Sequence, residues 1–425
     1  MIRVRPRCHQ RTASLLVCSL VMGIIVGHVL ASEITVTLIG PFGNWGDELT
    51  EALTLFSEKT QGVKAELLIT TDWNATMSQA ATMTAGGVAP DLLYGSATPF
   101  HYYALNHMSQ PIDSWVARDI DTTVYPESVL DAMRLGGSLY GLPTAVSPSF
   151  AYYNVDRFNE VGLDMLPVRW ASEAFDWDDF VTILRKLTCY ESAEGPSCFG
   201  SLAFGRGGGW NRLGMWGLDL FDPDMTEFYG NRPEVIEAME KFATLWTTHG
   251  VIGGRFMSGT AGMTMAHADV LNQLIQQQRS GSLLNWSVGV LPKGTKRLTY
   301  TAFHGIGLSA QTPHPEEAWQ LLKFLTYEPE GAVLFARAEN RIPLIPATTR
   351  DFMQRFTHLL PRGIITVFTE SPVYAYDAYL SRHPNGAHFL TLLDRELARP
   401  TRGEVSVQQV MNEIEPVIRA LLKER

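Results

Sequence analysis

Residues 139–154 read LYGLPTAVSPSFAYYN, and residues 155–163 continue as VDRFNEVGL. A turn containing Gly141 and Pro143 leads into an apolar, aromatic segment, and an amphipathic stretch follows. This order predicts a buried strand followed by a helix. The segment separates an earlier from a later part of the chain, and each part has its own pattern of elements.

The earlier part alternates strand-like and helix-like stretches. Residues 34–39 are β-branched and apolar, and Leu49, Ala52, Leu53 and Phe56 follow at helical spacing in a helix that should end near Gly62. Residues 63–70 predict a second strand, residues 73–85 a second helix, and residues 90–94 the start of a third strand. This order predicts a parallel sheet whose ligands collect beyond the carboxyl ends of the strands. The loops at residues 42–47, 71–74 and 95–100 are therefore expected on the ligand side.

The later part contains three helices with clear signals. Asp176 is a predicted N-cap for a helix with a buried stripe of Phe180, Ile183, Leu184 and Leu187. Residues 233–250 predict a second helix, opened by a proline and closed by a glycine, and residues 315–327 predict a third. The sequence shows no internal repeat, low-complexity tract or charge run.

The N-terminal residues carry an export signal. Arg3, Arg5, Arg7 and Arg11 precede an apolar run from Leu15 to Leu30, and residues 29–31 offer small residues for cleavage after Ala31. This pattern predicts a cleavable secretory signal over residues 1–31. A membrane anchor is the alternative, but the run is short for a spanning helix and contains His28. Lipidation at Cys18 is rejected because Val17 stands where a small residue is required.

Charge and length limit the classes of partner. Residues 1–31 hold four arginines and no acid, so 30 basic and 44 acidic residues remain after cleavage, for a net charge of −14. Such a chain repels nucleic acid and anionic membranes. No second apolar run could span a bilayer, so a soluble mature protein is expected. Its length exceeds what one core usually supports, which predicts two lobes.

After cleavage only Cys189 and Cys198 remain, on either side of a turn-forming stretch. In an oxidising compartment an isolated close pair predicts a local disulfide. Zinc would need two further ligands, and no CxxC or HxxxH motif lies nearby. We therefore predict a disulfide and no metal centre at this pair.

A series of short motifs accompanies residues 139–163. They are TAGGVAPD at residues 84–91, FMSGTAGM at 256–263, GVLPKG at 289–294, FHGIGLS at 303–309, EAW at 317–319 with FL at 324–325, and NRIP at 340–343. Their collinear order resembles the extracellular solute-binding proteins of family 1, the sugar-type periplasmic binding proteins of ABC importers.

The resemblance implies an α/β fold of the two-lobed periplasmic-binding-protein type (type II-like). Each lobe would hold a mainly parallel sheet flanked by helices, and crossing hinge strands would join them. The approximate expected bounds are 1–31 for the signal peptide, 32–146 plus 304–350 for the N-terminal lobe, and 147–303 plus 351–425 for the C-terminal lobe.

The resemblance also implies a function. The protein would be a periplasmic monomer without catalysis or cofactor, which captures a carbohydrate between its lobes and delivers it to ABC permease subunits. Sugars stack on aromatic rings and hydrogen-bond to polar side chains. The expected stacking residues are Trp45 and Trp210, with Trp216 or Trp286 as substitutes for Trp210. The expected polar ligand residues are Asn44, Asp72, Ser96, Ser147, His267, Asp269, His304 and Arg341.

Two of these positions differ from the best-known maltodextrin-binding members. Ser147 stands where those proteins carry an acidic residue, and Asp269 aligns with one of their aromatic residues. Both differences argue against a maltodextrin cargo.

Three alternatives remain open at this stage. A phosphorylated polyol, such as a glycerol phosphate ester, is the first, because Arg206, Arg212 and Arg341 could reach the cleft. A ferric-ion binder is the second, because Tyr102-Tyr103 and Tyr152-Tyr153 are tandem tyrosines. A secreted glycoside hydrolase is the third, although the acids form no recognisable catalytic signature and the HExxH, GxSxG and phosphate-loop patterns are absent.

Overall fold

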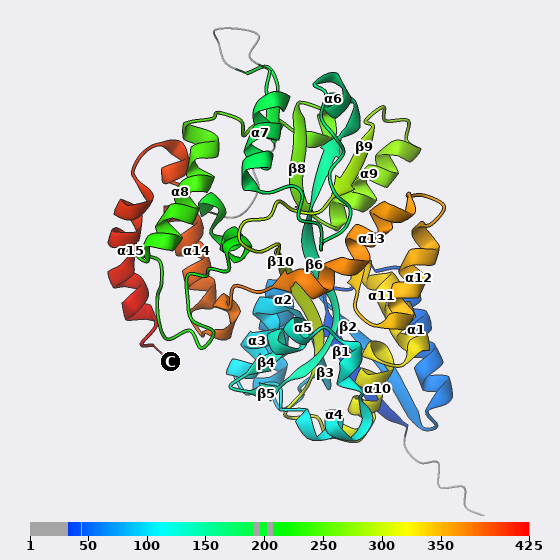
Figure 1. The fold of residues 1–425 in the computed structure, drawn as a ribbon. Helices are drawn as coiled ribbons and strands as arrows, with labels where there is room; N and C mark the ends of the chain where they lie inside the picture. The colour runs from blue at the N-terminus through cyan, green and yellow to red at the C-terminus, as the bar shows by residue number, and fades with distance from the viewer. Residues whose placement is uncertain (1–32, 44, 190–195, 202–206, 425) are drawn as a thin grey trace, which may run out of the picture.

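The computed structural model describes residues 33–43, 45–189, 196–201 and 207–424. Two α/β lobes share the long strands β6 (Gly141–Asn154) and β10 (Thr299–Leu308), which run between them (Figure 1). Hydrogen bonding links one sheet in the order β2-β1-β3-β10-β6-β8-β7. The other strands are β1 (Ile34–Gly40), β2 (Val63–Ile69), β3 (Leu92–Ser96), β4 (Arg134–Leu135), β5 (Ser138–Leu139), β7 (Phe199–Ser201), β8 (Ala261–His267), β9 (Trp286–Gly289), β11 (Ile342–Pro343) and β12 (Ala375–Tyr376).

Strand β6 confirms the buried strand predicted from residues 139–154. All of its residues are buried, because the strand belongs to both lobes in turn. Its first half pairs with β10 up to Pro148, and its second half pairs with β8 and β9 from Ser149 onward. The two-lobed α/β fold joined by crossing strands is thus the fold of this protein.

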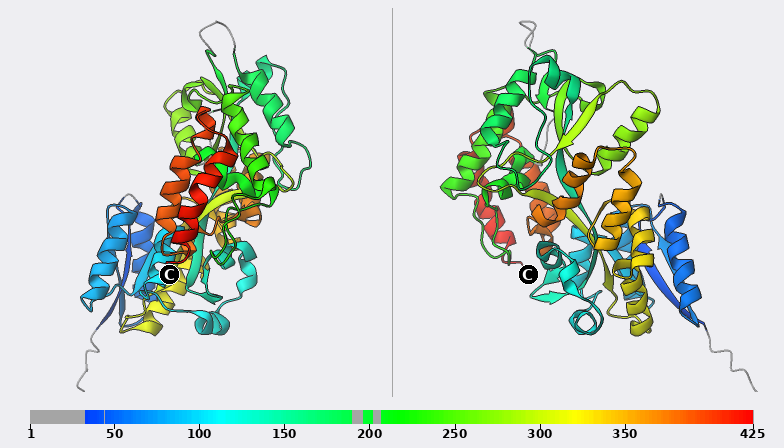
Figure 2. Two further views of the ribbon diagram at one scale, coloured as in Figure 1. Left: turned by 90° about the vertical axis from the view of Figure 1, so that its left-hand side faces the viewer. Right: turned by 45° about the vertical axis from the view of Figure 1, so that its right-hand side comes forward.

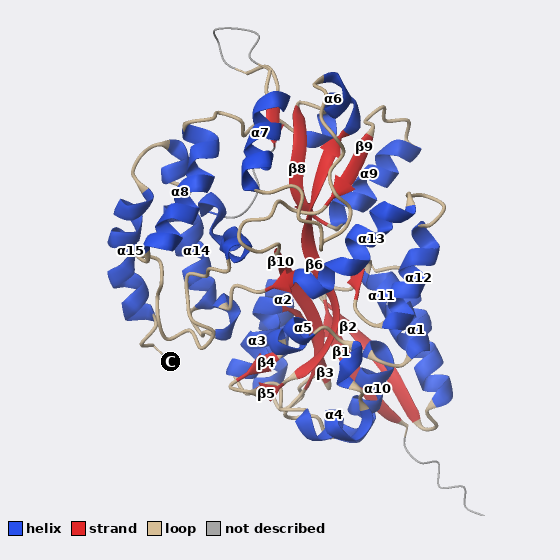
Figure 3. Cartoon of the chain, in the orientation of Figure 1, coloured by secondary structure: helices blue, strands red, loops and turns tan. Residues whose placement is uncertain are grey.

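Helices cover the sheet in both lobes (Figure 3). The α-helices are α1 (Asp47–Lys59), α2 (Trp73–Ala85), α3 (Ala97–Leu105), α4 (Asp113–Asp119), α5 (Glu127–Ala132), α6 (Val155–Glu160), α7 (Trp177–Leu187), α8 (Pro233–Thr247), α9 (Asp269–Arg279), α10 (Pro315–Thr326), α11 (Pro329–Glu339), α12 (Pro346–Phe356), α13 (Arg362–Glu370), α14 (Gly386–Glu396) and α15 (Val407–Leu421). The short 3₁₀ helices are η1 (Thr122–Val124), η2 (Gly207–Trp216), η3 (Phe256–Ser258), η4 (Ser371–Tyr374), η5 (Leu380–Arg382) and η6 (Pro400–Arg402).

The helices and strands predicted from hydrophobic spacing are confirmed, although Ile183, predicted in the buried stripe of α7, is only half-buried. Strands β1 and β2 pair in parallel, and β3 pairs in parallel with β1, as the alternating pattern requires. Asp176 caps α7 by accepting a hydrogen bond from the Asp179 amide, and the Asp179 carboxylate accepts from the Asp176 amide in return. This reciprocal arrangement satisfies amides that would otherwise lack partners at the start of the helix.

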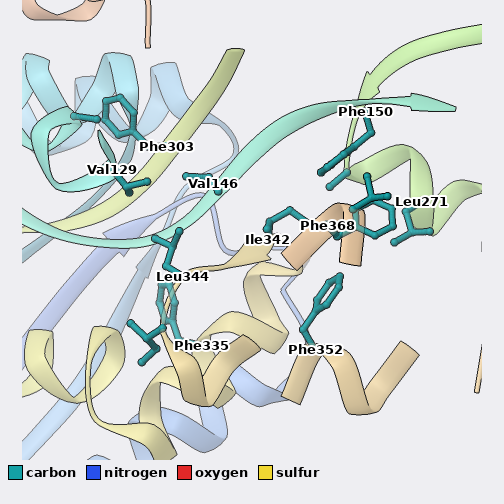
Figure 4. Packing of buried hydrophobic residues seen from close by; sticks show 14 of the residues in the cluster. Val129, Val146, Phe150, Leu271, Phe303, Phe335, Ile342, Leu344, Phe352 and Phe368 are labelled. Atoms are coloured by element: carbon teal, nitrogen blue, oxygen red, sulfur yellow. The ribbon is translucent and has the colours of Figure 1, made fainter. Parts of the chain in front are cut away.

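The main hydrophobic core runs through both lobes along β6. Figure 4 shows Val146 near Phe303 and Val129 at one end, and Phe150 beside Phe368 and Leu271 at the other. The Phe150 and Phe368 ring centroids are 4.6 Å apart. Because α13 follows β11 in the chain, this contact anchors the returning chain to the second half of β6.

A second core lies away from the sheet. Helices α8, α14 and α15 pack together beside the C-terminal lobe (Figure 2). Their buried residues include Met239, Phe389, Leu393, Val410 and Ile414. The C-terminal helices therefore complete the second lobe.

The predicted disulfide is present between Cys189 and Cys198, whose Cα atoms are 5.0 Å apart. It joins the residues after α7 to those before β7. In the part of the chain that the structure describes, no helix is both long and apolar enough to cross a membrane.

Candidate ligand site between the lobes

The carboxyl ends of the parallel strands bring several predicted residues together. Trp45 follows β1, Asp72 follows β2, and Ser96 ends β3. Asp72 is exposed and caps α2, since its Oδ1 accepts a hydrogen bond from the Ala75 amide at 2.9 Å. That hydrogen bond lowers the pKa of the Asp72 carboxyl. One carboxylate oxygen of Asp72 is thus already hydrogen-bonded to the first turn of α2.

A largely buried polar cluster lies beneath these loops, where the crossing segments meet. We call it the hinge cluster; it consists of Tyr94, Thr144, Ser147, His304, Glu339 and Arg341. Glu339 Oε1 accepts from Tyr94 Oη at 2.7 Å and from Thr144 Oγ1 at 3.1 Å. Arg341 Nη1 donates to Ser147 Oγ at 2.7 Å, and Arg341 Nε lies 4.0 Å from Glu339 Oε1. Ser147, His304 and Arg341 were all predicted from the sequence.

Burial sets the charge of this cluster. The His304 side chain is 3% exposed and that of Glu339 is fully covered. Burial raises the pKa of Glu339 to about 7. Burial also lowers the pKa of His304 well below its usual range, and Arg341 adds to this effect. His304 is therefore neutral at physiological pH, and among the described residues neither its Nε2 nor Glu339 Oε2 has a hydrogen-bond partner.

The hinge cluster also reaches the second lobe. The Ser147 carbonyl accepts a hydrogen bond from His267 Nδ1 at 2.6 Å. His267 ends β8, so this bond connects the first crossing strand to the C-terminal lobe. Residues from β6, β10, β8 and the α11–β11 turn are therefore linked in one polar network.

Two tryptophans border the hinge cluster. Trp45 is half-buried and packs edge to face against Phe42, Tyr94 and Phe335, with centroid distances of 4.9, 5.2 and 5.3 Å. Trp73, also half-buried, lies 5.3 Å from Tyr94 and 6.0 Å from His304 by ring centroid. From the sequence, residue 73 was predicted only as the start of a helix. Trp45 has three aromatic neighbours, whereas Trp73 opens α2 at the edge of the cluster.

A cavity of about 920 Å³ lies between the lobes, and we call it the interlobe cavity. Its first wall consists of Leu105, Ser128, Asp131 and residues 134–137; its second wall consists of Pro223, Asp224, Thr226, residues 375–377, Tyr379 and residues 382–384. A smaller cavity of about 300 Å³ shares Pro223, Tyr376, Asp377 and Tyr379 with it. Charged side chains line both walls, whereas the tyrosine rings, Tyr376 and Tyr379, belong to the second wall alone.

The segment from Tyr376 to Tyr379 separates the two cavities. Tyr379 adopts a left-handed backbone with φ of 58°, an unfavourable conformation for a bulky residue. The Arg382 guanidinium lies 4.7 Å from the centroid of the Tyr379 ring. Burial raises the pKa of Asp377 to about 6 and that of Asp219 to about 7. This segment begins at the last residue of β12, in a part of the chain where the sequence shows no motif.

The lobes touch beside the interlobe cavity. His101 Nδ1 and Ser381 Oγ are hydrogen-bonded at 2.8 Å, and Arg382 Nη2 donates to the Asp131 carbonyl at 3.1 Å. His101 and Asp131 belong to the first lobe, and the other two residues belong to η5. These two bonds join η5 to α3 and α5.

Other predicted residues lie outside the hinge cluster. Trp210 is 3% exposed within the second core, and its Nε1 donates to Asp394 Oδ1 at 3.0 Å. Trp286 is 8% exposed, and Trp216 packs against Trp177 and Phe242. Asn44 lies outside the described residues, and so does Arg206. Asp269 begins α9, but its side chain lies outside what the structure describes.

The tandem tyrosines are mostly core residues. Tyr103, Tyr152 and Tyr153 are at most 2% exposed. Within the described residues, no group of three or more His, Cys, Asp or Glu side chains is arranged to hold a metal ion.

The chain matches one protein family over most of its length. Residues 51–353 match the family described as bacterial extracellular solute-binding protein. The chain belongs to this family. Members are periplasmic or extracellular proteins of ABC importers, and the family is one of binding proteins rather than of enzymes.

Solved structures show the same fold at low sequence identity. The sugar-binding protein MalE from Xanthomonas citri is 16% identical with a TM-score of 0.76, over 92% of this chain and 98% of that one. A sugar transporter protein from Rhizobium etli in an open conformation is 18% identical with a TM-score of 0.74, over 92% and 100%. UgpB from Mycobacterium tuberculosis, in complex with glycerophosphocholine, is 17% identical with a TM-score of 0.71, over 92% and 98%.

Proposed function

We propose that this member of the family captures a carbohydrate between its lobes and delivers it unchanged to ABC permease subunits. The observation that supports this proposal is the interlobe cavity, whose two walls come from different lobes. A solute held there touches both lobes only when they are close, and this is how binding energy can favour the closed form.

The chemistry of the cavity suits a sugar. Tyr376 and Tyr379 offer rings for the C–H face of a pyranose, and Asp131, Asp224 and Thr226 offer hydrogen-bonding groups for its hydroxyls. Ligand cavities commonly measure roughly 300 to 1,000 Å³. The volume of about 920 Å³ is therefore large enough for a mono- to oligosaccharide.

The hinge cluster offers a second set of ligand groups, and its residues are not among those that line the interlobe cavity. His304 Nε2 has no hydrogen-bond partner in the part of the chain that the structure describes, and Arg341 keeps a third of its side chain exposed. Trp45, Trp73, Asp72 and Ser96 border the same region. We therefore retain these residues, with Ser147 and His267, as proposed ligand residues. Asn44 and Asp269 remain predictions from sequence, whereas Trp210 is not retained because its ring is buried in the second core.

A phosphorylated polyol is the second candidate. Arg341 and Arg382 place guanidinium groups at the hinge cluster and in the interlobe cavity, and guanidinium groups bind phosphate oxygens strongly. UgpB, a structural neighbour, was solved with glycerophosphocholine, which contains a phosphodiester. Arg341 and Arg382 would bind the phosphate of this cargo, a group that a neutral sugar lacks.

The test is a thermal-shift screen of neutral sugars and phosphorylated polyols against the purified mature protein, followed by calorimetry on each positive. A ligand of the native state raises the melting temperature in proportion to RT ln(1 + [L]/Kd). The expected result is a saturable shift with a sugar that chromatography recovers unchanged. Binding of the phosphorylated polyols alone would select the second candidate, and turnover of any glycoside would overturn a binding-only function.

A further inference from the structure

An arginine contacts both sulfur atoms of the disulfide. Arg157, in α6, places Nη2 3.0 Å from Cys189 Sγ and 2.7 Å from Cys198 Sγ. The same Nη2 donates to the Leu187 carbonyl at 2.7 Å. The Arg157 side chain is only 16% exposed, and among the described residues it forms an ion pair with Glu160 at 3.6 Å. A guanidinium group is thus held against the S–S bond in a mostly buried position.

A disulfide gains little from such a neighbour, because its sulfur atoms are weak acceptors. A cysteine thiolate gains much more, since a nearby cation lowers the pKa of the thiol. In thiol–disulfide exchange, the sulfur whose thiol has the lower pKa is the better leaving group. Arg157 is therefore placed to favour breaking the S–S bond.

The two sulfur atoms differ in access. Cys198 is 6% exposed and lies closer to Arg157, whereas Cys189 is partly exposed. An external thiolate can reach Cys189, and the buried sulfur beside Arg157 can then leave. We propose that the Cys189–Cys198 pair is a thiol–disulfide exchange site for an external dithiol, with Cys189 the sulfur attacked and Cys198 the leaving thiolate paired with Arg157.

The exchange balances in two steps. One thiolate of the dithiol attacks Cys189 Sγ and forms a mixed disulfide, while the S–S bond breaks and its electron pair moves to Cys198 Sγ. The second thiolate of the dithiol then attacks the dithiol's other sulfur, which is bonded to Cys189 Sγ in the mixed disulfide. That bond breaks, and Cys189 leaves as a thiolate that takes a proton from water. The dithiol is oxidised to a disulfide, and the cysteine pair is reduced by two electrons.

The site connects to the proposed ligand region through the sheet. The disulfide ties the end of α7 to β7, and β7 pairs with β8, which ends at His267. Reduction would free this edge of the second lobe. The exchange chemistry itself does not depend on the identity of the cargo.

The experiment measures the rate of reduction by dithiothreitol in the native protein at pH 7.5. Arg157→Gln should slow reduction roughly three- to tenfold, because the leaving thiolate loses its cation, and Arg157→Lys should recover part of the rate. Arg185→Gln, an exposed position on α7, is the matched control and should leave the rate unchanged. If Arg157 only holds local structure, its loss should loosen the loop and accelerate reduction. An unchanged or faster rate in Arg157→Gln overturns the proposal.

A second measurement titrates the leaving sulfur directly. In Cys189→Ser, the iodoacetamide reactivity of Cys198 should follow a pKa below the ordinary cysteine value of about 8.5, and Arg157→Gln in that background should raise it. A Cys198 pKa at or above the ordinary value, insensitive to Arg157, also overturns the proposal.

Discussion

At the scale of single residues, Glu339 is the centre of the hinge cluster. Its carboxyl accepts hydrogen bonds from two other elements and lies 4.0 Å from Arg341. Burial disfavours the charged form, and Arg341 favours it. As a result, the Glu339 carboxyl titrates near neutral pH. The same carboxyl links the crossing segments through its hydrogen bonds.

This balance predicts a pH dependence of stability. The pKa of Glu339 is about 7 in the folded state, against a usual value of 4.5, so the folded state binds more protons between these values. The free energy of unfolding should therefore fall as pH rises from about 4.5 to 7, by about 1.4 kcal/mol per unit of pKa difference. His304 has the opposite sign, because its lowered pKa costs stability as pH falls below 6.5.

The test compares urea unfolding of wild type and Glu339→Gln between pH 4.5 and 8. The difference between the two proteins isolates the Glu339 contribution, and Glu339→Gln should gain relative stability as pH rises. Glu330→Gln is the control, because Glu330 lies on the same helix and is exposed. Parallel stability profiles for wild type and Glu339→Gln would contradict the assigned titration.

The two tryptophans beside the cluster should respond differently to truncation. Trp45→Ala removes a ring with three aromatic neighbours and should cost about 3 kcal/mol of stability. Trp73→Ala should cost less stability and weaken binding of a confirmed sugar by about tenfold if its ring stacks on the ligand. Unfolding curves and calorimetry on both variants separate these effects, and unchanged affinity in Trp73→Ala would remove it from the site.

At the scale of elements, the disulfide closes a short loop between α7 and β7. A loop of this size should contribute about 2 to 3 kcal/mol, so full reduction should lower the melting temperature without unfolding the protein at 25 °C. Calorimetry of oxidised and fully reduced protein measures the effect, with Cys189→Ser/Cys198→Ser as the permanently open reference. Equal melting temperatures would show that the disulfide does not stabilise the fold.

The elements show what local sequence can predict. The α7 cap and its buried stripe were predictable, because the amides and apolar side chains involved lie within one helix. The closeness of Glu339 to Tyr94 was not, since 245 residues separate them in the chain. Trp210 is buried in the second core, where its Nε1 donates to Asp394 of α14, a helix that follows much later in the chain. Spacing alone could not place that ring.

The interlobe cavity was missed for a related reason. Most of its second wall comes from residues 375–384, which contain no repeat of apolar spacing and follow the last crossing segment. Their position depends on packing of α13 and η4 against β6 and Trp170, whose ring stacks on Tyr374 at 5.4 Å. The family resemblance predicted the fold and the crossing strands correctly. The side chains of the second wall could be identified only from the structure.

At the scale of the whole molecule, motion between the lobes must bend the strands that they share. The β6–β10 pairing shifts register between His304 and Gly305, beside the hinge cluster. Such irregularities bend a strand locally. The lobes should therefore move about this point while the sheet within each lobe keeps its pairing.

Small-angle scattering tests this motion with a sugar confirmed by thermal shift. The ligand contacts both walls of the cavity only in a closed form, so it should reduce the radius of gyration by shifting the population. Ser381→Ala removes the His101 contact between the lobes and should enlarge the radius of gyration of the free protein while leaving that of the complex nearly unchanged. A sugar that gives no thermal shift is the control and should leave the scattering unaltered. If a confirmed ligand binds with no change in the radius of gyration, the cavity closes around cargo by local side-chain movement alone, and the proposed hinge at His304 and Gly305 is wrong.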